Sequence, residues 1–455
     1  MLTDHSHIPF VQSSSYPVRH GNTVRPLIDG IPAFRRISEA IEMARSSVWV
    51  TVTFMWTAFE MPDGRGSALD VLDRAAARGI DVRIIFWRPD VETKSLKANA
   101  FWGSADHIRQ LEIRKSGVRV RWDRAHPGFC QHQKSWLIDA GGENEIAFVG
   151  GINLNPNSMA FPGHNGAGQT HDVYVEIAGP STVDVHHNFA QRWNEASERF
   201  AEDGRWGSGS EADLPFPISI PGQCGSALVQ IQRTIHSDRY TDGAGPPGGK
   251  AFDIARGEQS ILAQYRAAID AARRSIYIEN QYVTVLEIVE CLHRALQRGV
   301  EVVLLLPAEP DGLMRYVAES SQSFLEAWVA LGRFENFTLA GIAGLNAEGQ
   351  RKAIYVHDKL MLVDDAWATV GSCNLHSFSL FGNVEMNASF WEPDIVRKFR
   401  CELFHEHLEQ DTSHMDDREA LRHFRQVALE NLERFNAGNP AWQGLAFALD
   451  PAGYR

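Results

Sequence analysis

The sequence predicts an α/β fold built from a duplicated unit, with a mixed, largely parallel sheet in each half and helices flanking it. Two observations lead to this prediction. Helical sequence runs directly into strand sequence several times, and the same order of elements occurs twice along the chain. Strands fed by helices are typical of parallel or mixed sheets covered on both faces. The 455 residues, of which 44% are hydrophobic, suit a globular protein with sizeable cores.

The first repeated element is a helix that continues into a strand. Residues 33–57 and 261–283 both place apolar residues at helical spacing, followed by Ala-Arg, a Ser and an alternating β-rich run. In the second repeated element, residues 72–90 and 292–311, a helical run ends at Arg-Gly and a hydrophobic strand follows at once. The two halves are therefore expected to share one fold and to be related by a pseudo-two-fold axis.

These repeats divide the chain into two similar domains, expected at residues 22–205 and 222–410. The seam between them lies near residues 201–226, which are rich in Gly, Ser and Pro. Residues 411–455 have no repeat partner and are expected to form a helical tail.

Two Gly- and Pro-rich stretches break the repeat, at residues 155–170 and 236–257. Long loops of this kind are often binding loops or lids. A tolerated surface insertion explains them equally well, and the sequence leaves both interpretations open.

Each half contains one His-x-Lys-x4-Asp motif, followed by a Gly-containing turn and an Asn. The first copy consists of His132, Lys134 and Asp139 with Asn153 downstream, and the second of His357, Lys359 and Asp364 with Asn374. In a strand, residues i and i+2 share a face, so the His and Lys of each motif should project together. If the halves pack about a pseudo-two-fold axis, both pairs converge on one pocket. Two imidazoles and two cations suit a phosphodiester, whose charge must be stabilised while one group attacks and another leaves.

These paired motifs resemble those of the phospholipase D superfamily. The stretches 171–193, 275–283 and 355–365 are similar to the lipid-cleaving phospholipases in particular, and the resemblance covers roughly residues 25–410. It implies a covalent phosphohistidine mechanism. One His attacks phosphorus, the other protonates the leaving alcohol, and water then attacks the phosphohistidine.

The resemblance also implies roles for individual residues. It makes His132 the nucleophile and His357 the acid, although the symmetry of the sequence alone does not distinguish them. The phosphoryl oxygens would be bound by side chains from both halves, namely Lys134, Lys359, Asn153 and Asn374.

Each His also needs a partner that fixes its tautomer and stabilises the imidazolium. The candidates are Asp172 and Glu385, which occupy matching positions in the two halves and where the family has an acidic residue. Asp139 and Asp364 are expected to be structural. His171, beside Asp172, is open between a functional and a structural role.

Neither a metal nor another cofactor is expected. The five Cys residues are scattered and form no C-x-x-C, and no H-E-x-x-H or Cys/His cluster suggests a metal site. The implied mechanism requires no metal either, because the two lysines supply the positive charge.

The leading hypothesis is a phospholipase D that hydrolyses glycerophospholipids to phosphatidate and the free head-group alcohol, with transphosphatidylation to alcohols. The alternatives are a phosphatidyltransferase such as cardiolipin synthase, a nuclease of the same superfamily, and a scaffold without activity. Synthases of this kind usually carry N-terminal membrane helices, and the sequence contains no such run. The net charge of -13 counts against a nuclease. Intact His and Lys in both motifs count against a scaffold.

The expected partner is a phospholipid substrate met peripherally at a membrane surface, without nucleic acid, and a monomer is expected. No secretory signal or transmembrane run is recognisable, so the sequence favours a cytoplasmic protein or one released without such a signal.

Overall fold

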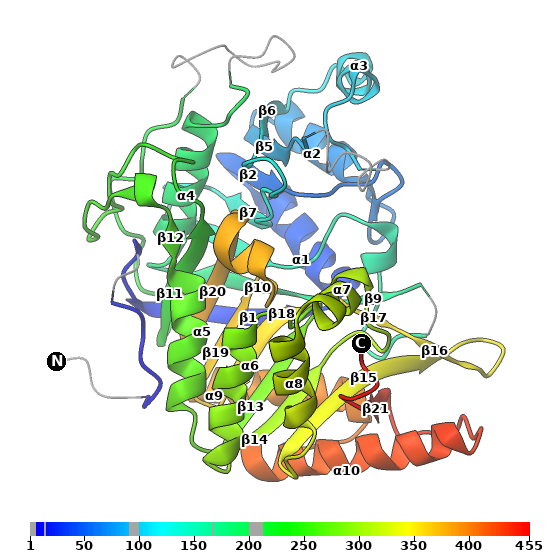
Figure 1. Ribbon diagram of the computed structural model, residues 1–455. Coiled ribbons are helices and arrows are strands. Elements are labelled where there is room, and N and C mark those ends of the chain that lie inside the picture. Colours follow the sequence, from blue (N-terminus) through cyan, green and yellow to red (C-terminus); the bar gives the residue numbers. More distant parts are fainter. Residues whose placement is uncertain (1–5, 13–14, 91–99, 166–167, 200–212) are drawn as a thin grey trace.

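The computed structural model describes residues 6–12, 15–90, 100–165, 168–199 and 213–455. Residues 201–212 of the expected seam, and residues 166–167 of the first asymmetric loop, lie outside the described residues. The first half lies in the upper part of Figure 1 and the second half in the lower part.

The strands of the first half form a mixed sheet. Their spatial order is β6 (Arg119–Asp123), β5 (Asp81–Trp87), β2 (Ser47–Val52), β7 (Ser135–Ile138), β8 (Ile146–Gly150), β10 (Val173–Ala178) and β1 (Arg19–Ile28). The β6–β5 and β5–β2 pairs are parallel, and the remaining pairs are antiparallel.

The second half repeats this sheet strand by strand. The order is β15 (Phe337–Leu345), β14 (Glu301–Leu305), β13 (Ser275–Asn280), β18 (Lys359–Val363), β19 (Trp367–Gly371), β20 (Glu385–Trp391) and β11 (Ala227–Ile235). The duplicated α/β unit with a mixed sheet is thus confirmed, but two strand pairs in each half are parallel and four are antiparallel, so the sheets are less parallel than the sequence predicts. Parallel pairing occurs where helices connect the strands, whereas short turns join β7 to β8 and β18 to β19 and make those pairs antiparallel.

The two sheets join through β1 and β11, which pair antiparallel at Asn22 and Ala227. The largest core lies between the halves, where Val149 and Val175 of the first belong to one cluster with Val370 of the second. Burial of this shared core makes the halves one packed body rather than two independent domains.

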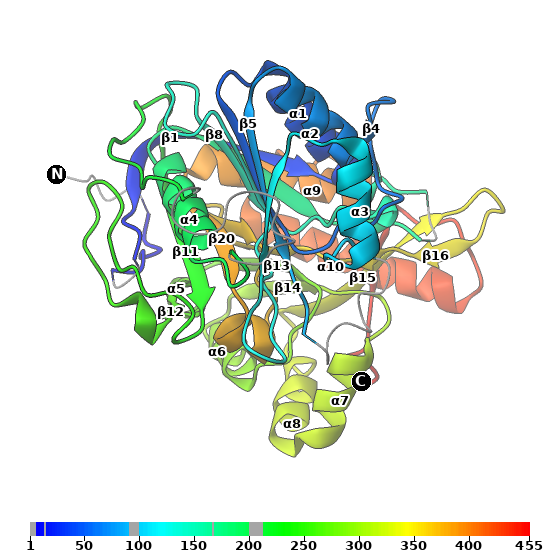
Figure 2. The ribbon, with the colours of Figure 1, turned by 90° about the horizontal axis from the view of Figure 1, so that it is seen from above.

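Helices cover both faces of the sheets, as Figures 1 and 2 show. On the outer faces pack α1 (Gly30–Met43) and α2 (Ala68–Ala77) in the first half, and α5 (Ser260–Ala271), α6 (Leu286–Gln297) and α8 (Gln322–Leu331) in the second. The shared core is lined by α4 (Thr182–Asn194), α9 (Pro393–Leu408) and α10 (Asp417–Asn436). Two further helices are α3 (Ala105–Arg114) and α7 (Gly312–Ser320).

The short elements lie mostly at loops and edges. They are β3 (Glu60–Met61), β4 (Gly66–Ser67), β9 (Thr170–His171), β12 (Glu258–Gln259), β16 (Arg351–Ala353), β17 (Tyr355–Val356), β21 (Ala446–Ala448), the 3-10 turns Pro156–Ser158 and Ile254–Arg256, and the π-helical turn Phe378–Gly382. The expected C-terminal helical tail contains α10 and also β21, which pairs antiparallel with β15 and extends the sheet. Across the described ranges, no helix is both long and apolar enough to span a bilayer.

Candidate active site

Both His-x-Lys pairs lie just before or at the start of equivalent strands. Strand β7 begins after Lys134 and β18 begins at Lys359, so the strands start later than the sequence pattern predicts. The His and Lys of each motif nevertheless stay together. Lys134 Nζ donates a hydrogen bond to the His132 carbonyl at 2.8 Å, and Lys359 Nζ donates to the carbonyl of His357.

The carboxylate partners of the two histidines cross between the halves. His132 Nδ1 lies 2.9 Å from Glu385 Oε2, and His357 Nδ1 lies 2.6 Å from Asp172 Oδ2. Each imidazole of one half is therefore oriented by a carboxylate of the other half. With Nδ1 turned to the carboxylate, Nε2 of each ring faces away from it, which is the arrangement that acid–base or nucleophilic chemistry at Nε2 requires.

The backbone reinforces this crossing. The His132 N–H donates to the carbonyl of Val384 at 2.8 Å, and the His357 N–H donates to the carbonyl of His171 at 2.9 Å. Each bond is made to the residue that precedes the orienting carboxylate. The same local geometry thus occurs twice, related by the pseudo-symmetry of the fold, and it brings the two motifs to one place.

The two carboxylates are held differently. Asp172 Oδ1 accepts a hydrogen bond from its neighbour's backbone, Val173 N–H, at 2.8 Å. Glu385 is held mainly by hydroxyls, since Ser372 Oγ donates to Oε2 at 2.6 Å and Ser379 Oγ donates to Oε1 at 2.5 Å. The sequence motifs did not single out these two serines. A Cβ at Gly151 would lie 2.3 Å from Asp172 Oδ1, so the turn after β8 needs glycine at this position for the close approach.

Burial sets the charge states of the site. It lowers the pKa of His132 to about 4 and, with help from the neighbouring charge of Lys359, lowers the pKa of Lys134 to about 7. Burial likewise lowers the pKa of Lys359 to about 8. The influence of Lys359 on Lys134 indicates that both cations belong to one site. Their pKa values near neutrality mean that an entering anion would strengthen their protonation.

The carboxylates respond to burial in opposite ways. Burial raises the pKa of Asp172, against the opposing charge of Lys359. For Glu385, burial also acts to raise the pKa, but the interaction with His132, the charge of Lys134 and the hydrogen bond from Ser372 outweigh this and hold the pKa below its usual value. Glu385 is thus the more firmly ionised partner of the two.

The two asparagines occupy equivalent positions, three residues beyond the ends of β8 and β19. Within the described residues, neither Asn153 Oδ1 nor Asn374 Oδ1 has a hydrogen-bond partner, although both atoms are buried. Buried amides without an internal partner suit groups that bind a ligand. Asn153 lines a small cavity together with Lys134 and Phe54, and the Phe54 ring lies 6.2 Å from the His132 ring.

The motif aspartates lie away from this site. Asp139 Oδ1 accepts hydrogen bonds from the backbone N–H groups of Arg45 and Ser46, each at 2.7 Å. Asp364 accepts from Arg273 and Arg274 N–H groups at 2.8 Å. These N–H groups belong to the turns from α1 to β2 and from α5 to β13. The placement supports the structural role expected for both aspartates.

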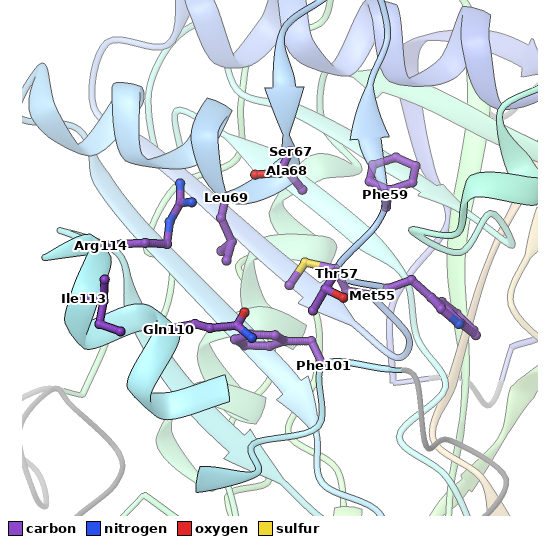
Figure 3. Close-up of a pocket in the computed structure, with 11 residues that line it drawn as sticks. Met55, Thr57, Phe59, Ser67, Ala68, Leu69, Phe101, Gln110, Ile113 and Arg114 are labelled. Atoms are coloured by element: carbon purple, nitrogen blue, oxygen red, sulfur yellow. The ribbon is translucent and has the colours of Figure 1, made fainter. Parts of the chain in front are cut away.

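An apolar pocket of about 220 Å³ is lined in part by residues 55–57, which directly follow Phe54 in the chain. Met55 and Trp56, which follow Phe54, contribute to its wall together with Leu69, Phe101 and Gln110. Figure 3 shows Met55, Leu69 and Phe101 pointing toward one another around it. The pocket belongs to the first half, and neither His-x-Lys pair lines it.

The fold and site define an enzyme that acts on phosphodiesters within the phospholipase D superfamily. The sequence profile described as "Cardiolipin synthase, PLD-like domain" matches residues 37–193 and 265–407, one stretch in each half. The chain belongs to this family, and the resemblance noted from the motifs is confirmed.

Several curated proteins are similar over most of the chain. Cardiolipin synthase 1 of Staphylococcus epidermidis is 25% identical over 398 residues, which cover 86% of this chain and 68% of that protein. Cardiolipin synthase A of Pseudomonas entomophila is 26% identical over 378 residues, covering 81% of this chain and 65% of that protein. Phospholipase D A of Dictyostelium discoideum is 25% identical over 495 residues, covering 86% of this chain but 36% of that protein. The chain thus spans about two thirds of the synthases and about a third of the phospholipase.

Among solved structures, phosphatidylserine synthase of Haemophilus influenzae matches with a TM-score of 0.53 at 12% identity, covering 92% of this chain and 96% of that one. This likeness concerns the fold. The relatives in sequence include more cardiolipin synthases than phospholipases, so they favour the synthase alternative over the hydrolase that the sequence analysis put first.

Proposed function

We propose that the protein transfers the phosphatidyl group of a phospholipid to an alcohol through a covalent phosphohistidine, at one site to which both halves contribute. The observation that carries this proposal is the crossed pair of contacts, His132 with Glu385 and His357 with Asp172. Two imidazoles oriented from opposite halves provide one nucleophile and one acid–base group for a single phosphorus atom.

In the first step, Nε2 of His132 attacks phosphorus and the bond from phosphorus to the head-group oxygen breaks. His357 gives its proton to that oxygen, and the head group leaves as a neutral alcohol. The low pKa of His132, about 4, keeps this ring neutral and nucleophilic at physiological pH. The four candidate phosphate ligands, Lys134, Lys359, Asn153 and Asn374, stabilise the charge on the phosphoryl oxygens.

In the second step, an acceptor alcohol gives its proton to His357 as its oxygen attacks phosphorus, and the bond from phosphorus to His132 breaks. Water in place of the alcohol gives phosphatidate, so hydrolysis is the same chemistry with another acceptor. The similarity to Phospholipase D A keeps hydrolysis as the second candidate function.

The apolar pocket supports a lipid substrate. Most of its lining side chains are apolar, among them Met55, Leu69 and Phe101, and suit an acyl chain. The one arginine of the lining, Arg114, is paired with Asp70 and Asp73. We assign this pocket to part of an acyl chain of the donor lipid.

The test is to incubate the purified protein with vesicles of phosphatidylglycerol and to quantify the lipid products, with His132→Ala as the inactive control. Cardiolipin and free glycerol in equal amounts support transfer, whereas phosphatidate as the main product at all substrate concentrations supports hydrolysis. A parallel reaction with a single-stranded oligonucleotide distinguishes a nuclease. Cleavage of the oligonucleotide without turnover of any lipid would refute the substrate assignment.

The covalent step is tested separately, with a donor lipid that is chiral at phosphorus. Two in-line displacements each invert the configuration, so the product should retain it. Ethanol added to the same reaction should yield phosphatidylethanol. Net inversion would exclude the phosphohistidine whatever the substrate.

A further inference from the structure

A second cluster of titratable groups lies behind the His357–Asp172 pair and takes no part in the proposed reaction. It consists of Asp29, His164, His171 and Glu406. Their side chains are completely or almost completely buried, with exposed fractions of 0% for the first three and 2% for Glu406. Asp29 precedes α1, His164 lies in the first asymmetric loop, His171 ends β9 and Glu406 lies on α9 of the second half.

The polar atoms of the cluster surround one point. His164 Nε2 lies 3.1 Å from Asp29 Oδ2 and 3.3 Å from Glu406 Oε1. His171 Nδ1 lies 3.0 Å from Asp29 Oδ1 and 3.4 Å from Glu406 Oε1, and the two ring nitrogens are 3.4 Å apart. Bonds of about 2.0–2.1 Å from a tetrahedral zinc ion put neighbouring ligand atoms about 3.3–3.4 Å apart, so these separations are close to those of a metal site.

Hydrogen bonds inside the cluster do not satisfy its carboxylates. Among the residues described, Glu406 Oε2 is a buried atom that accepts no hydrogen bond, and Asp29 Oδ2 has only its 3.1 Å contact with His164 Nε2. A buried carboxylate oxygen without a partner costs free energy unless a cation neutralises it. A positive ion at the shared point would contact Asp29 and Glu406 at once.

The outward-facing ring nitrogens also fit a metal site. His171 Nε2 lies 2.9 Å from Glu279 Oε2, and His164 Nδ1 lies 3.2 Å from Gln169 Oε1. Histidines that bind metals usually donate their second ring N–H to a carboxylate or carbonyl oxygen, which fixes the tautomer that binds the ion. If these outer nitrogens carry the protons, the inner nitrogens of both rings present lone pairs to the shared point.

We propose that Asp29, His164, His171 and Glu406 bind one divalent transition-metal ion, with zinc as the best fit. Magnesium and calcium prefer oxygen ligands throughout, whereas two imidazoles with two carboxylates suit zinc and its neighbours. Four protein ligands in a buried position leave no place for substrate, which is the property of a structural rather than a catalytic metal. The proposal concerns a site apart from the phosphate-binding groups.

Such an ion would position the acid–base pair without touching the substrate. His171 adjoins Asp172, and Asp29 N–H donates to the Asp172 carbonyl at 2.9 Å. The ion would also tie α9 of the second half to three segments of the first half. The asymmetric loop at residues 155–170 would then contribute one of the metal ligands, His164.

The test begins with wild-type protein purified through a tag without histidines and analysed by inductively coupled plasma mass spectrometry. We expect one transition-metal ion per chain. His164→Ala should lose it, and His186→Ala should keep it. His186 is a matched control because it is also a buried histidine beside a carboxylate, Glu145, at 3.4 Å but lies outside the cluster. Cobalt introduced during expression should give the intense visible bands of a four-coordinate ion.

Thermal unfolding provides a readout that is independent of activity. Prolonged warming with EDTA should lower the Tm of the wild type, and added zinc should restore it, while His164→Ala should respond to neither. Wild-type protein that contains no metal above the buffer blank, even after growth in supplemented medium, would overturn the proposal and leave a proton-linked ion network instead. Full metal content in a folded His164→Ala would overturn it as well. If His164→Ala does not fold, the wild-type analysis still decides.

Discussion

Replacing Asp172 by Asn should damage the enzyme far more than replacing Glu385 by Gln. Asp172 Oδ1 accepts from Val173 N–H at 2.8 Å, and Oδ2 faces His357 Nδ1 at 2.6 Å. An amide has only one oxygen, and a backbone N–H cannot accept a hydrogen bond. In the Asp172→Asn variant the amide oxygen must therefore stay with Val173, which turns the NH₂ group toward His357. The ring is then forced to carry its proton on Nε2.

At Glu385 the same change can be accommodated. The hydroxyl of Ser379 is able to reverse and accept from the new NH₂ group, so the amide oxygen can stay with His132 Nδ1. The longer contact from Asn383 Nδ2, at 3.2 Å, is given up. His132 loses the charge of its partner and the acceptor Oε1, which lies 3.0 Å from Nδ1. It keeps its tautomer, because Nδ1 also lies 3.0 Å from the Ser372 carbonyl, which can only accept.

The expected losses in kcat follow from these two situations. A wrong imidazole tautomer in a His–Asp pair lowers turnover by about 10⁴-fold, which sets the expectation for Asp172→Asn. Losing one hydrogen bond to a charged group costs about 1.5–3 kcal/mol, or roughly 10- to 10²-fold, which sets it for Glu385→Gln.

The assay is product formation from phosphatidylglycerol vesicles under saturating conditions, with ¹⁵N NMR of labelled histidine to identify the tautomer of His357. Thermal unfolding checks that both variants are folded. Equal losses in the two variants, or an unchanged tautomer in Asp172→Asn, would refute the reasoning.

Three further predictions concern the same site. His132→Ala and His357→Ala should each reduce turnover by several orders of magnitude. The double variant should be little worse, because the effects of replacing groups that act as a unit are not additive. A single variant that keeps a few per cent of activity would contradict a shared site. Because Lys134 and Lys359 have pKa values of about 7 and 8 in the free protein, they lose their charge as the pH rises through this range, and kcat/KM should fall there. The fall in kcat should come at higher pH, since bound phosphate raises both pKa values, and a kcat/KM profile that stays flat to about pH 9 would argue against a role for these charges. Finally, Gln110→Trp should fill the apolar pocket and shift the preference toward donor lipids with shorter acyl chains. Arg109→Trp, on the same helix but outside the pocket lining, should leave this preference unchanged. An unchanged chain-length preference in a folded Gln110→Trp variant would show that the pocket does not bind the substrate.

Much of the fold was predictable because it is encoded locally and twice. Alternation of helical and strand periods, with Gly at the helix ends, indicated the repeated units, and the structure has the same strand order in both. The numbers of parallel and antiparallel strand pairs were harder to predict, because they depend on which connections between strands lack a helix. The connection between β7 and β8 contains a Gly-Gly turn signal, but this does not reveal that β7 also pairs antiparallel with β2.

For the site, too, the features that local sequence patterns determine were predictable, and those that depend on distant contacts were not. The spacing of His132 and Lys134 predicted that these side chains act together, and the structure places them together. That His132 pairs with Glu385 rather than with Asp172 depends on how the halves pack, which no local pattern records. The proposed metal ligands were missed for the same reason. Asp29 and Glu406 stand near opposite ends of the chain, and a search for closely spaced ligands does not connect them.

The crossed carboxylates have a consequence for how this enzyme is able to diversify. In a dimer of identical chains, both histidines would have the same acid beside them, held in the same way. Any substitution near one histidine would also be present near the other. Here one ring faces an aspartate fixed by the main chain, and the other faces a glutamate fixed by serine hydroxyls. Because the two halves are joined in one polypeptide, their sequences can differ. The surroundings of one imidazole can therefore favour nucleophilic attack, while those of the other favour proton transfer.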